Sequence, residues 1–210
     1  MPKLYLLGGE NVLRRSAREV NEHAFQEARA PLAVLVFAWA RASFDRGYKK
    51  KKSLFDYFLS LGASSVTFVD YSDSINVIAK KMADSSLIYL TGGLPLVLVE
   101  RFRKMGVDLL LSNYDGVIIG RSAGALALCN KYVITYRSNS KTKVVNGLGL
   151  ADLTLKVHYA LEKDEVLEQL SRKEKIYAVP EGSALVYDSG NLSCIGTAYL
   201  FENGEKRNGV

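Results

Sequence analysis

The chain has 210 residues, of which 48% are hydrophobic and 24% charged, a balance that excludes a mainly disordered, fibrous or disulfide-scaffold protein. Lys and Arg number 28 against 22 Asp and Glu, so the formal net charge is +6, which favours anionic ligands but is small for a nucleic-acid-binding protein. The length fits one core, and we predict a single α/β domain over residues 1–210.

Apolar runs alternate with amphipathic segments through the first two thirds of the chain. Strands are predicted at residues 3–7, 32–37, 65–70, 87–90 and 116–119. Between them, apolar residues three and four positions apart predict helices at residues 17–28, 53–61, 75–83 and 97–105. This alternation predicts an α/β fold with a doubly wound, mostly parallel sheet and helices on both faces.

The last third of the chain has shorter apolar runs joined by turns. Strands are predicted at residues 133–136, 142–145, 155–158, 176–179, 184–187 and 192–195, with one charged helix at residues 161–172. Turn residues such as those at 188–191 favour hairpins or strands added at a sheet edge over further crossovers.

A Gly-x-Ser-x-Gly motif lies at the end of the predicted strand 116–119 and consists of Gly120, Ser122 and Gly124. A strand before this motif and helix-forming residues after it are typical of a nucleophile elbow, in which small residues permit a sharp turn. The N–H of Ala123, at the start of the helix, is a candidate to stabilise an oxyanion. A glycine-rich structural turn or a phosphate-binding loop is the alternative interpretation.

A serine nucleophile needs a base, and the chain has two histidines, His23 and His158. His23 lies among polar residues of a predicted helix, which is typical of a solvated surface histidine. His158 ends a predicted strand, where catalytic side chains of parallel sheets gather, and we predict that it is the base. A structural histidine is the alternative for this position.

The third member of a catalytic triad is a carboxylate that orients the imidazole. Asp152 is the one acidic residue between Ser122 and His158 in the sequence. Glu181 follows the predicted strand at residues 176–179 and precedes a glycine, as a residue of a site loop would. The residues by themselves leave the choice between these two carboxylates open.

Four blocks of sequence together resemble one enzyme family: Leu90-Thr91-Gly92-Gly93, Gly120-Arg121-Ser122-Ala123-Gly124-Ala125, Gly147-Leu148-Gly149-Leu150 ahead of His158, and Val179-Pro180-Glu181-Gly182-Ser183-Ala184. In this order they resemble the serine peptidases of the dipeptidase E and cyanophycinase group, family S51. The resemblance implies a flavodoxin-like sheet similar to that of class I glutamine amidotransferases, with serine in place of their cysteine. By position it implies that Ser122 is the nucleophile, that His158 is the base, and that the N–H groups of Gly93 and Ala123 form the oxyanion hole.

The chain departs from this family pattern at two places. The dipeptidase E branch has an Asp shortly after the nucleophile, but residues 132–137 contain no acid, whereas the cyanophycinase branch uses a Glu at the position of Glu181. We therefore favour Glu181 over Asp152 as the triad acid. The second departure is Leu94, which follows the double glycine where the family usually has a polar residue.

The resemblance implies short peptide substrates, with an N-terminal aspartate or an isopeptide bond at aspartate. Arg121 precedes the nucleophile and is a candidate to bind a substrate carboxylate, a solvated or structurally paired arginine being the alternative. We therefore predict a serine-type peptidase that cleaves such bonds through an acyl-enzyme with a Ser122-His158-Glu181 triad. A non-catalytic protein of the same fold that binds a small ligand is the second hypothesis.

Further predictions concern partners and compartment. The lysines at residues 49–52 are typical of a solvated loop, with an anion or nucleic-acid contact as the alternative; no nucleic-acid-binding motif accompanies them, and we expect no nucleic-acid partner. The two cysteines form no CxxC pair, so we expect reduced thiols and neither metal nor cofactor. The longest apolar run, residues 32–40, is shorter than the ~20 residues of a membrane helix, and residues 4–7 are too few for the core of a secretion signal. We expect a cytoplasmic monomer or homodimer.

Overall fold

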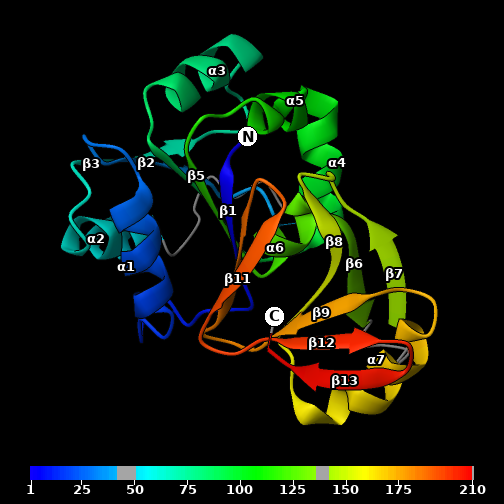
Figure 1. Ribbon diagram of the computed structural model, residues 1–210. Helices are drawn as coiled ribbons and strands as arrows, with labels where there is room; N and C mark the ends of the chain where they lie inside the picture. The colour runs from blue at the N-terminus through cyan, green and yellow to red at the C-terminus, as the bar shows by residue number, and fades with distance from the viewer. Residues whose placement is uncertain (42–50, 136–141, 210) are drawn as a thin grey trace.

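The computed structural model describes residues 1–41, 51–135 and 142–209 of the chain. Within these residues the strands form two sheets. Sheet A has the order β11-β10-β1-β5-β4-β2-β3, and sheet B has the order β13-β12-β9-β8-β6-β7. Figure 1 shows sheet A through the centre and left of the molecule and sheet B at the lower right.

Sheet A is parallel from β1 to β3 and antiparallel where β10 and β11 are added beside β1. The five strands predicted in the first two thirds of the chain are confirmed, with ends that differ by at most two residues. The strands of sheet A are β1 (Lys3–Leu7), β2 (Ala33–Phe37), β3 (Ser65–Val69), β4 (Leu87–Leu90), β5 (Val117–Arg121), β10 (Ala184–Asp188) and β11 (Asn191–Ile195).

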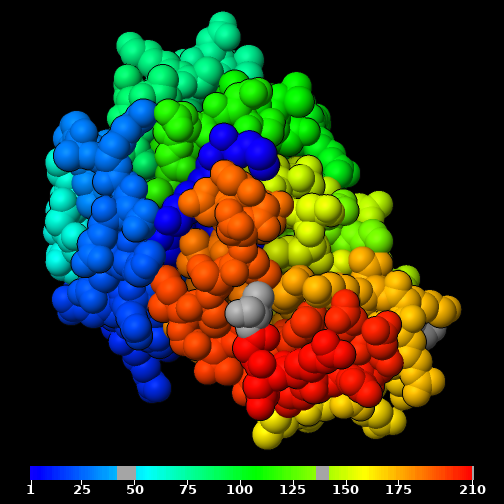
Figure 2. All heavy atoms as spheres, in the orientation of Figure 1, coloured from blue at the N-terminus to red at the C-terminus, as the bar shows by residue number. Residues whose placement is uncertain are grey.

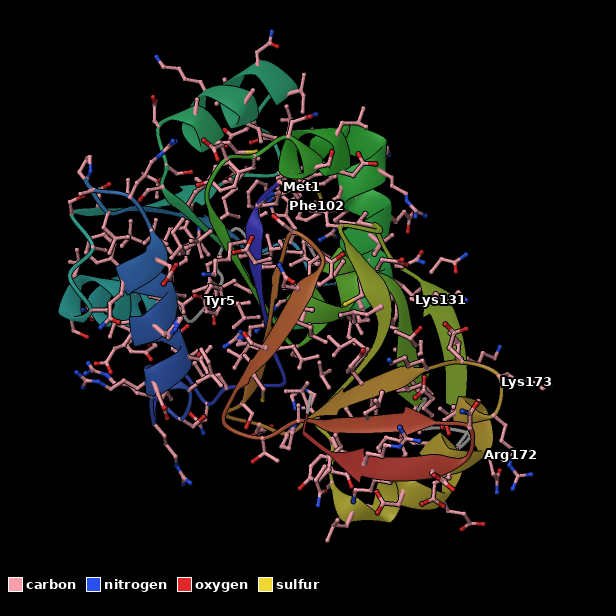
Figure 3. The ribbon with its side chains drawn as sticks, in the orientation of Figure 1. Met1, Tyr5, Phe102, Lys131, Arg172 and Lys173 are labelled. Atoms are coloured by element: carbon pink, nitrogen blue, oxygen red, sulfur yellow. The ribbon has the colours of Figure 1, made fainter. Side chains whose placement is uncertain are left out.

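Helices cover both faces of sheet A, because successive side chains of a strand point to opposite faces. On β1, Tyr5 and Leu7 pack with α1 (Arg18–Glu27) and α2 (Lys51–Ser60), whereas Leu4 and Leu6 pack with the helices of the other face. Tyr5 of the first face and Phe102 of the second are labelled in Figure 3. The helices of the second face are α3 (Ile75–Ala83), α4 (Pro95–Met105), α5 (Val107–Ser112) and α6 (Ala123–Leu128).

The sequence did not predict α5, because its six residues are too few to display a helical period clearly.

Two of the four lysines at residues 49–52 lie outside the described residues. Of the other two, Lys52 forms an ion pair with Asp56, with 2.7 Å between Nζ and Oδ2. None of the helices in the described ranges is long and apolar enough to cross a membrane.

Sheet B corrects the expectation for the last third of the chain. Hairpins were expected, and β6–β7 and β12–β13 are antiparallel pairs, but β6, β8 and β9 are parallel. A crossover through η1 (Leu161–Lys163) and α7 (Asp164–Ser171) joins β8 to β9, and α7 covers one face of the sheet by packing Leu167 against Ile176 and Phe201. The strands are β6 (Cys129–Thr135), β7 (Thr142–Asn146), β8 (Ala151–Val157), β9 (Ile176–Val179), β12 (Tyr199–Glu202) and β13 (Glu205–Asn208).

The C-terminal hairpin β12–β13 was not predicted, although its turn carries a signal. Asn203 and Gly204 have φ values of 56° and 85°, as the two central residues of a tight hairpin turn require. Asn-Gly is the residue pair that such turns favour, so the dipeptide indicated this hairpin.

One hydrophobic core joins the two sheets. Leu90 and Ile118 of sheet A belong to the same buried cluster as Leu155 and Val157 of sheet B. Between them lies α6, whose six residues are all buried, and α6 leads directly from β5 of sheet A into β6 of sheet B. The ends of β5 and β8 therefore come together near the start of α6.

Candidate active site

Ser122 stands at the turn from β5 to α6, with φ 50° and ψ −107°. A positive φ is strained for a residue with a side chain, so close packing must hold this turn in place. A Cβ on Gly120 would lie 2.6 Å from the nitrogen of Ala125, and a Cβ on Gly124 would lie 2.5 Å from the carbonyl oxygen of Leu90. Both glycines of the motif are thus needed for the turn, which has the geometry of the predicted elbow.

A relay of two hydrogen bonds leads away from Ser122. Its Oγ lies 2.7 Å from Nε2 of His158, and Nδ1 of His158 lies 3.0 Å from Oε1 of Glu181. Because the carboxylate accepts the Nδ1 proton, Nε2 is left to accept the serine proton. The side chains of His158 and Glu181 are 49% and 60% exposed, so the relay is open to solvent.

The end of β1 holds the backbone of all three parts of the relay. The carbonyl oxygens of residues 7–9 accept, in order, the N–H groups of Ser122, His158 and Gly182, each at 2.9 Å. Gly182 directly follows Glu181, and His158 has φ 50°, so this residue too is held in a strained conformation. We call residues 7–9 the anchoring segment.

Gly8 and Gly9 let the anchoring segment approach the relay. A Cβ on Gly9 would lie 2.5 Å from Cε1 of His158 and 3.0 Å from Cγ of Glu181. A Cβ on Gly8 would lie 2.1 Å from the carbonyl oxygen of Pro180. Sequence reasoning missed this segment, although two successive glycines directly after a strand indicate a close approach of backbone.

The double glycine after β4 lies beside Ser122. A Cβ on Gly92 would be 3.4 Å from the Cβ of Ser122, and Gly93 has φ 154° and abuts the carbonyl of Ala40. Ala123 is the first residue of α6, where N–H groups have no acceptor within the helix. The structure therefore places Gly92, the residue before Gly93, against Ser122, and Ala123 directly after Ser122 in the chain.

Asp152 and His23 lie away from this relay. Asp152 is an exposed residue of β8 that accepts a hydrogen bond of 3.1 Å from Asn130. It precedes His158 by six residues, a distance of about 20 Å along an extended strand. His23 is exposed on α1, and its Nδ1 lies 2.8 Å from the hydroxyl of Tyr5.

A polar cluster that the sequence did not predict lies next to the anchoring segment. Arg121 is only 6% exposed, and its guanidinium carbon is 5.9 Å from the centre of the Tyr89 ring. The Tyr89 hydroxyl donates to the carboxylate of Glu10 at 3.1 Å. Burial raises the pKa of Glu10 above its ordinary 4.5, although the bond from Tyr89 and the charge of Arg121 act in the opposite direction.

No group of three or more His, Cys, Asp or Glu side chains in the described part of the chain is arranged to hold a metal ion. Cys129, the first residue of β6, is buried, and its Sγ donates to the carbonyl of Ala125 at 3.2 Å. Burial raises the pKa of this thiol, so it is not a nucleophile at neutral pH.

Comparisons with known proteins agree with this architecture. The model of peptidase family S51 matches residues 41–195. A peptidase from an acI-B1 Actinobacterium has a similar structure, with a TM-score of 0.75 and 18% identity over 99% of this chain and 93% of that chain. A protein described as a peptidase E, from Listeria monocytogenes EGD-e, has a TM-score of 0.70 and 19% identity over 93% of this chain and 98% of its own. The search of curated proteins gave no significant match.

Proposed function

Because this chain belongs to peptidase family S51, a family of serine-type peptidases, we propose that it hydrolyses short peptides through an acyl-enzyme on Ser122. The observation that carries this proposal is the relay itself, with 2.7 Å from Ser122 Oγ to His158 Nε2 and 3.0 Å from His158 Nδ1 to Glu181 Oε1. A nucleophile within hydrogen-bond reach of a base, and a base oriented by a third group, is the arrangement that acyl transfer needs.

The reaction proceeds in two halves. In the first, His158 takes the proton of Ser122 while Oγ attacks the peptide carbonyl, and it then gives this proton to the leaving amine. In the second, His158 takes a proton from water while the water oxygen attacks the acyl-enzyme, and it then returns this proton to Ser122 Oγ as the acid is released. Glu181 keeps the proton-bearing Nδ1 turned toward itself and stabilises the imidazolium that forms in each half.

The oxyanion of each tetrahedral intermediate needs N–H donors next to Ser122. We assign this role to the N–H groups of Gly93 and Ala123. Support comes from the position of the double glycine beside Ser122 and from the start of α6 at Ala123. Backbone donors fixed in place before the reaction stabilise developing negative charge without reorganisation.

Aspartyl peptides and isopeptides are the substrates that we propose within the peptide class. The net charge of +6 favours an anionic substrate. Arg121 was a candidate to bind the aspartyl carboxylate, but it is buried beside Tyr89. A substrate carboxylate would reach this guanidinium only by displacing its neighbours, so Arg121 fits a structural role better.

We propose that residues 1–210 act as one α/β domain with the strand arrangement of class I glutamine amidotransferases, as a monomer or homodimer. The buried cluster shared by the two sheets supports one domain. Cys129 and Cys194 are both free, which supports a reducing, cytoplasmic compartment.

The proposal is tested by labelling the protein with a fluorophosphonate and mapping the modified peptide. We expect the adduct on Ser122, and we expect Ser122→Ala to lose at least about 10⁴-fold in kcat on a peptide substrate. Ser112→Ala is the matched control, because Ser112 is an exposed residue at the end of α5 whose hydroxyl donates to the Leu109 carbonyl. Absence of label on Ser122 together with absence of hydrolysis would favour the small-ligand-binding alternative.

A further inference from the structure

Glu10 is the first residue with a side chain after Gly8 and Gly9. The two glycines of the anchoring segment have no side chain to fix them, and their backbone carbonyls hold His158 and Gly182. The Gly8 N–H donates to the carbonyl of Ser183 at 2.9 Å, and the segment continues directly into Glu10, so the contacts of the Glu10 carboxylate restrain it at its other end.

The Glu10 carboxylate accepts hydrogen bonds from two elements, a strand of sheet A and a helix that covers it. Its Oε2 accepts the hydroxyl of Tyr89 on β4 at 3.1 Å, and its Oε1 accepts Nδ2 of Asn21 on α1 at 3.1 Å. Asn21 is fully buried and also donates to the hydroxyl of Tyr57 on α2 at 3.1 Å. The side chain of Glu10 is therefore tied to β4, α1 and, through Asn21, α2.

The same cluster reaches the strand that carries the nucleophile. Arg121 is the last residue of β5 and directly precedes Ser122, and its guanidinium lies over the ring of Tyr89. The positive charge of Arg121 attracts the Glu10 carboxylate. Glu10 thus links the anchoring segment to the end of β5.

Stability does not account for the charge at this position. Burial raises the pKa of Glu10, which means that folding disfavours the ionised carboxylate at neutral pH. Glu174, in the turn between α7 and β9, is the opposite case, because the hydrogen bond from Lys131 holds the pKa of Glu174 below its ordinary value. A partly buried carboxylate that costs folding free energy suggests a functional reason for its presence.

We propose that Glu10 is a positioning residue for the relay. Through Tyr89 and Asn21 it holds the backbone of residues 8 and 9, and these residues set His158 between Ser122 and Glu181. Ser122 itself is held by Leu7, which belongs to β1. A shift of residues 8 and 9 therefore moves His158 and the Glu181 loop relative to the nucleophile. The inference rests on the proposed function of the relay.

The test compares Glu10→Ala and Glu10→Gln with Glu174→Gln in peptide hydrolysis and thermal unfolding at pH 7. We expect Glu10→Ala to lower kcat by about 10²-fold, the effect of displacing catalytic groups by about 1 Å, with KM changed by less than about twofold. Glu10→Gln should recover part of kcat, because its amide oxygen still accepts one hydrogen bond. It should not lower Tm. Glu174→Gln should lower Tm and leave kcat unchanged.

A second readout does not depend on peptide hydrolysis. Nitrogen-15 NMR of the His158 ring reports the hydrogen bond from Nδ1 to Glu181, and we expect Glu10→Ala to change these signals while Glu174→Gln leaves them unchanged. If the wild-type protein neither hydrolyses peptides nor labels at Ser122, the proposed function fails and the NMR result still decides the role of Glu10. Wild-type kcat and unchanged His158 signals in Glu10→Ala would overturn the inference. If Glu10→Ala does not fold, the same two readouts on Glu10→Gln decide.

Discussion

The relay depends on residues that occupy unusual backbone conformations. Ser122 and His158 both have φ 50°, and each such conformation costs about 1–3 kcal/mol when it carries a side chain. The carbonyls of Leu7 and Gly8, which accept the N–H groups of these two residues, compensate by fixing the strained backbone. The backbone conformation fixed in this way keeps the two side chains facing each other at hydrogen-bond distance.

We predict that substitution of Gly8 and substitution of Gly9 in the anchoring segment have different outcomes. In Gly9→Ala the new methyl would collide with the ring of His158, a side chain that can rotate away, so the fold should survive while kcat falls by about 10²-fold. In Gly8→Ala the methyl would lie 2.1 Å from the backbone oxygen of Pro180, and the protein should lose stability. Tm and kcat of both variants check this. Equal losses of Tm in the two would contradict it.

The acid of the relay is tested by a second pair of variants. Glu181→Gln removes the negative charge that orients His158, and we expect a loss in kcat of up to ~10⁴-fold. Asp152→Asn should change kcat by less than about twofold, because Asp152 is an exposed residue bound to Asn130. Steady-state kinetics of the two variants provide the measurement. If Asp152→Asn loses activity and Glu181→Gln keeps it, Glu181 is not the acid of the relay.

At the scale of elements, the crossover from β8 to β9 fixes the residue that follows His158. The hydroxyl of Tyr159 donates to Asp164 at the start of α7, and Lys206 of β13 donates to the Tyr159 hydroxyl at 2.6 Å and to Asp164 at 2.9 Å. Lys206 also lies 4.5 Å from the ring centre of Tyr199. The C-terminal hairpin thus holds together the start of α7 and the end of β8.

The pH dependence of stability tests another connection within sheet B. The hydrogen bond from Lys131 on β6 lowers the pKa of Glu174 below its ordinary 4.5, so the folded protein binds this proton more weakly than the unfolded chain. The resulting stability is complete well above pH 4.5 and is lost as the pH falls through the lower, folded-state pKa.

We therefore expect Glu174→Gln to lower Tm at pH 7 by about 2–4 °C, the shift that ~1 kcal/mol produces in a chain of this size. The difference from wild type should shrink steadily below pH 4.5, because the unfolded wild-type chain then takes up the proton before the folded protein does. Calorimetry between pH 3 and pH 7 measures this difference in Tm between Glu174→Gln and wild type. A Tm difference that is constant over this range would show that the charge of Glu174 contributes nothing.

At the scale of the whole molecule, the relay lies where the two sheets meet. Ser122 follows β5 of sheet A, His158 follows β8 of sheet B, and Glu181 lies in the connection from β9 of sheet B to β10 of sheet A. Figure 2 shows the orange segment that contains β10 and β11 between the blue N-terminal segment and the red C-terminal hairpin. Relative movement of the sheets would separate the three side chains.

The proposal of one domain predicts that the two sheets unfold together. In urea, circular dichroism and peptidase activity should be lost in one transition with the same midpoint. Phe201→Ala removes a fully buried side chain of sheet B and should cost about 3–5 kcal/mol, moving both midpoints equally although Phe201 lies outside the relay. Activity that is lost well before the loss of secondary structure would indicate that the sheets unfold separately.

The sequence by itself determined the parts of this protein that depend on short segments. Strand and helix periods placed the five parallel strands of sheet A, and the Gly-x-Ser-x-Gly motif indicated the turn at Ser122. The chain has only two histidines, so the position of His158 after a strand was enough to select it. These features depend on neighbours within a few residues, which a sequence displays directly.

The family resemblance favoured Glu181 over Asp152, but only the tertiary structure shows the contact of Glu181 with His158 and what holds the relay. Asp152 is closer in the sequence to His158 than Glu181 is, yet β8 extends it away while the β9–β10 connection brings Glu181 to the imidazole. The separation of sheet B, the anchoring segment and the contacts of Glu10 likewise depend on hydrogen bonds between residues far apart in the chain. No local period encodes such bonds, because both partners acquire their positions only when the strands have paired.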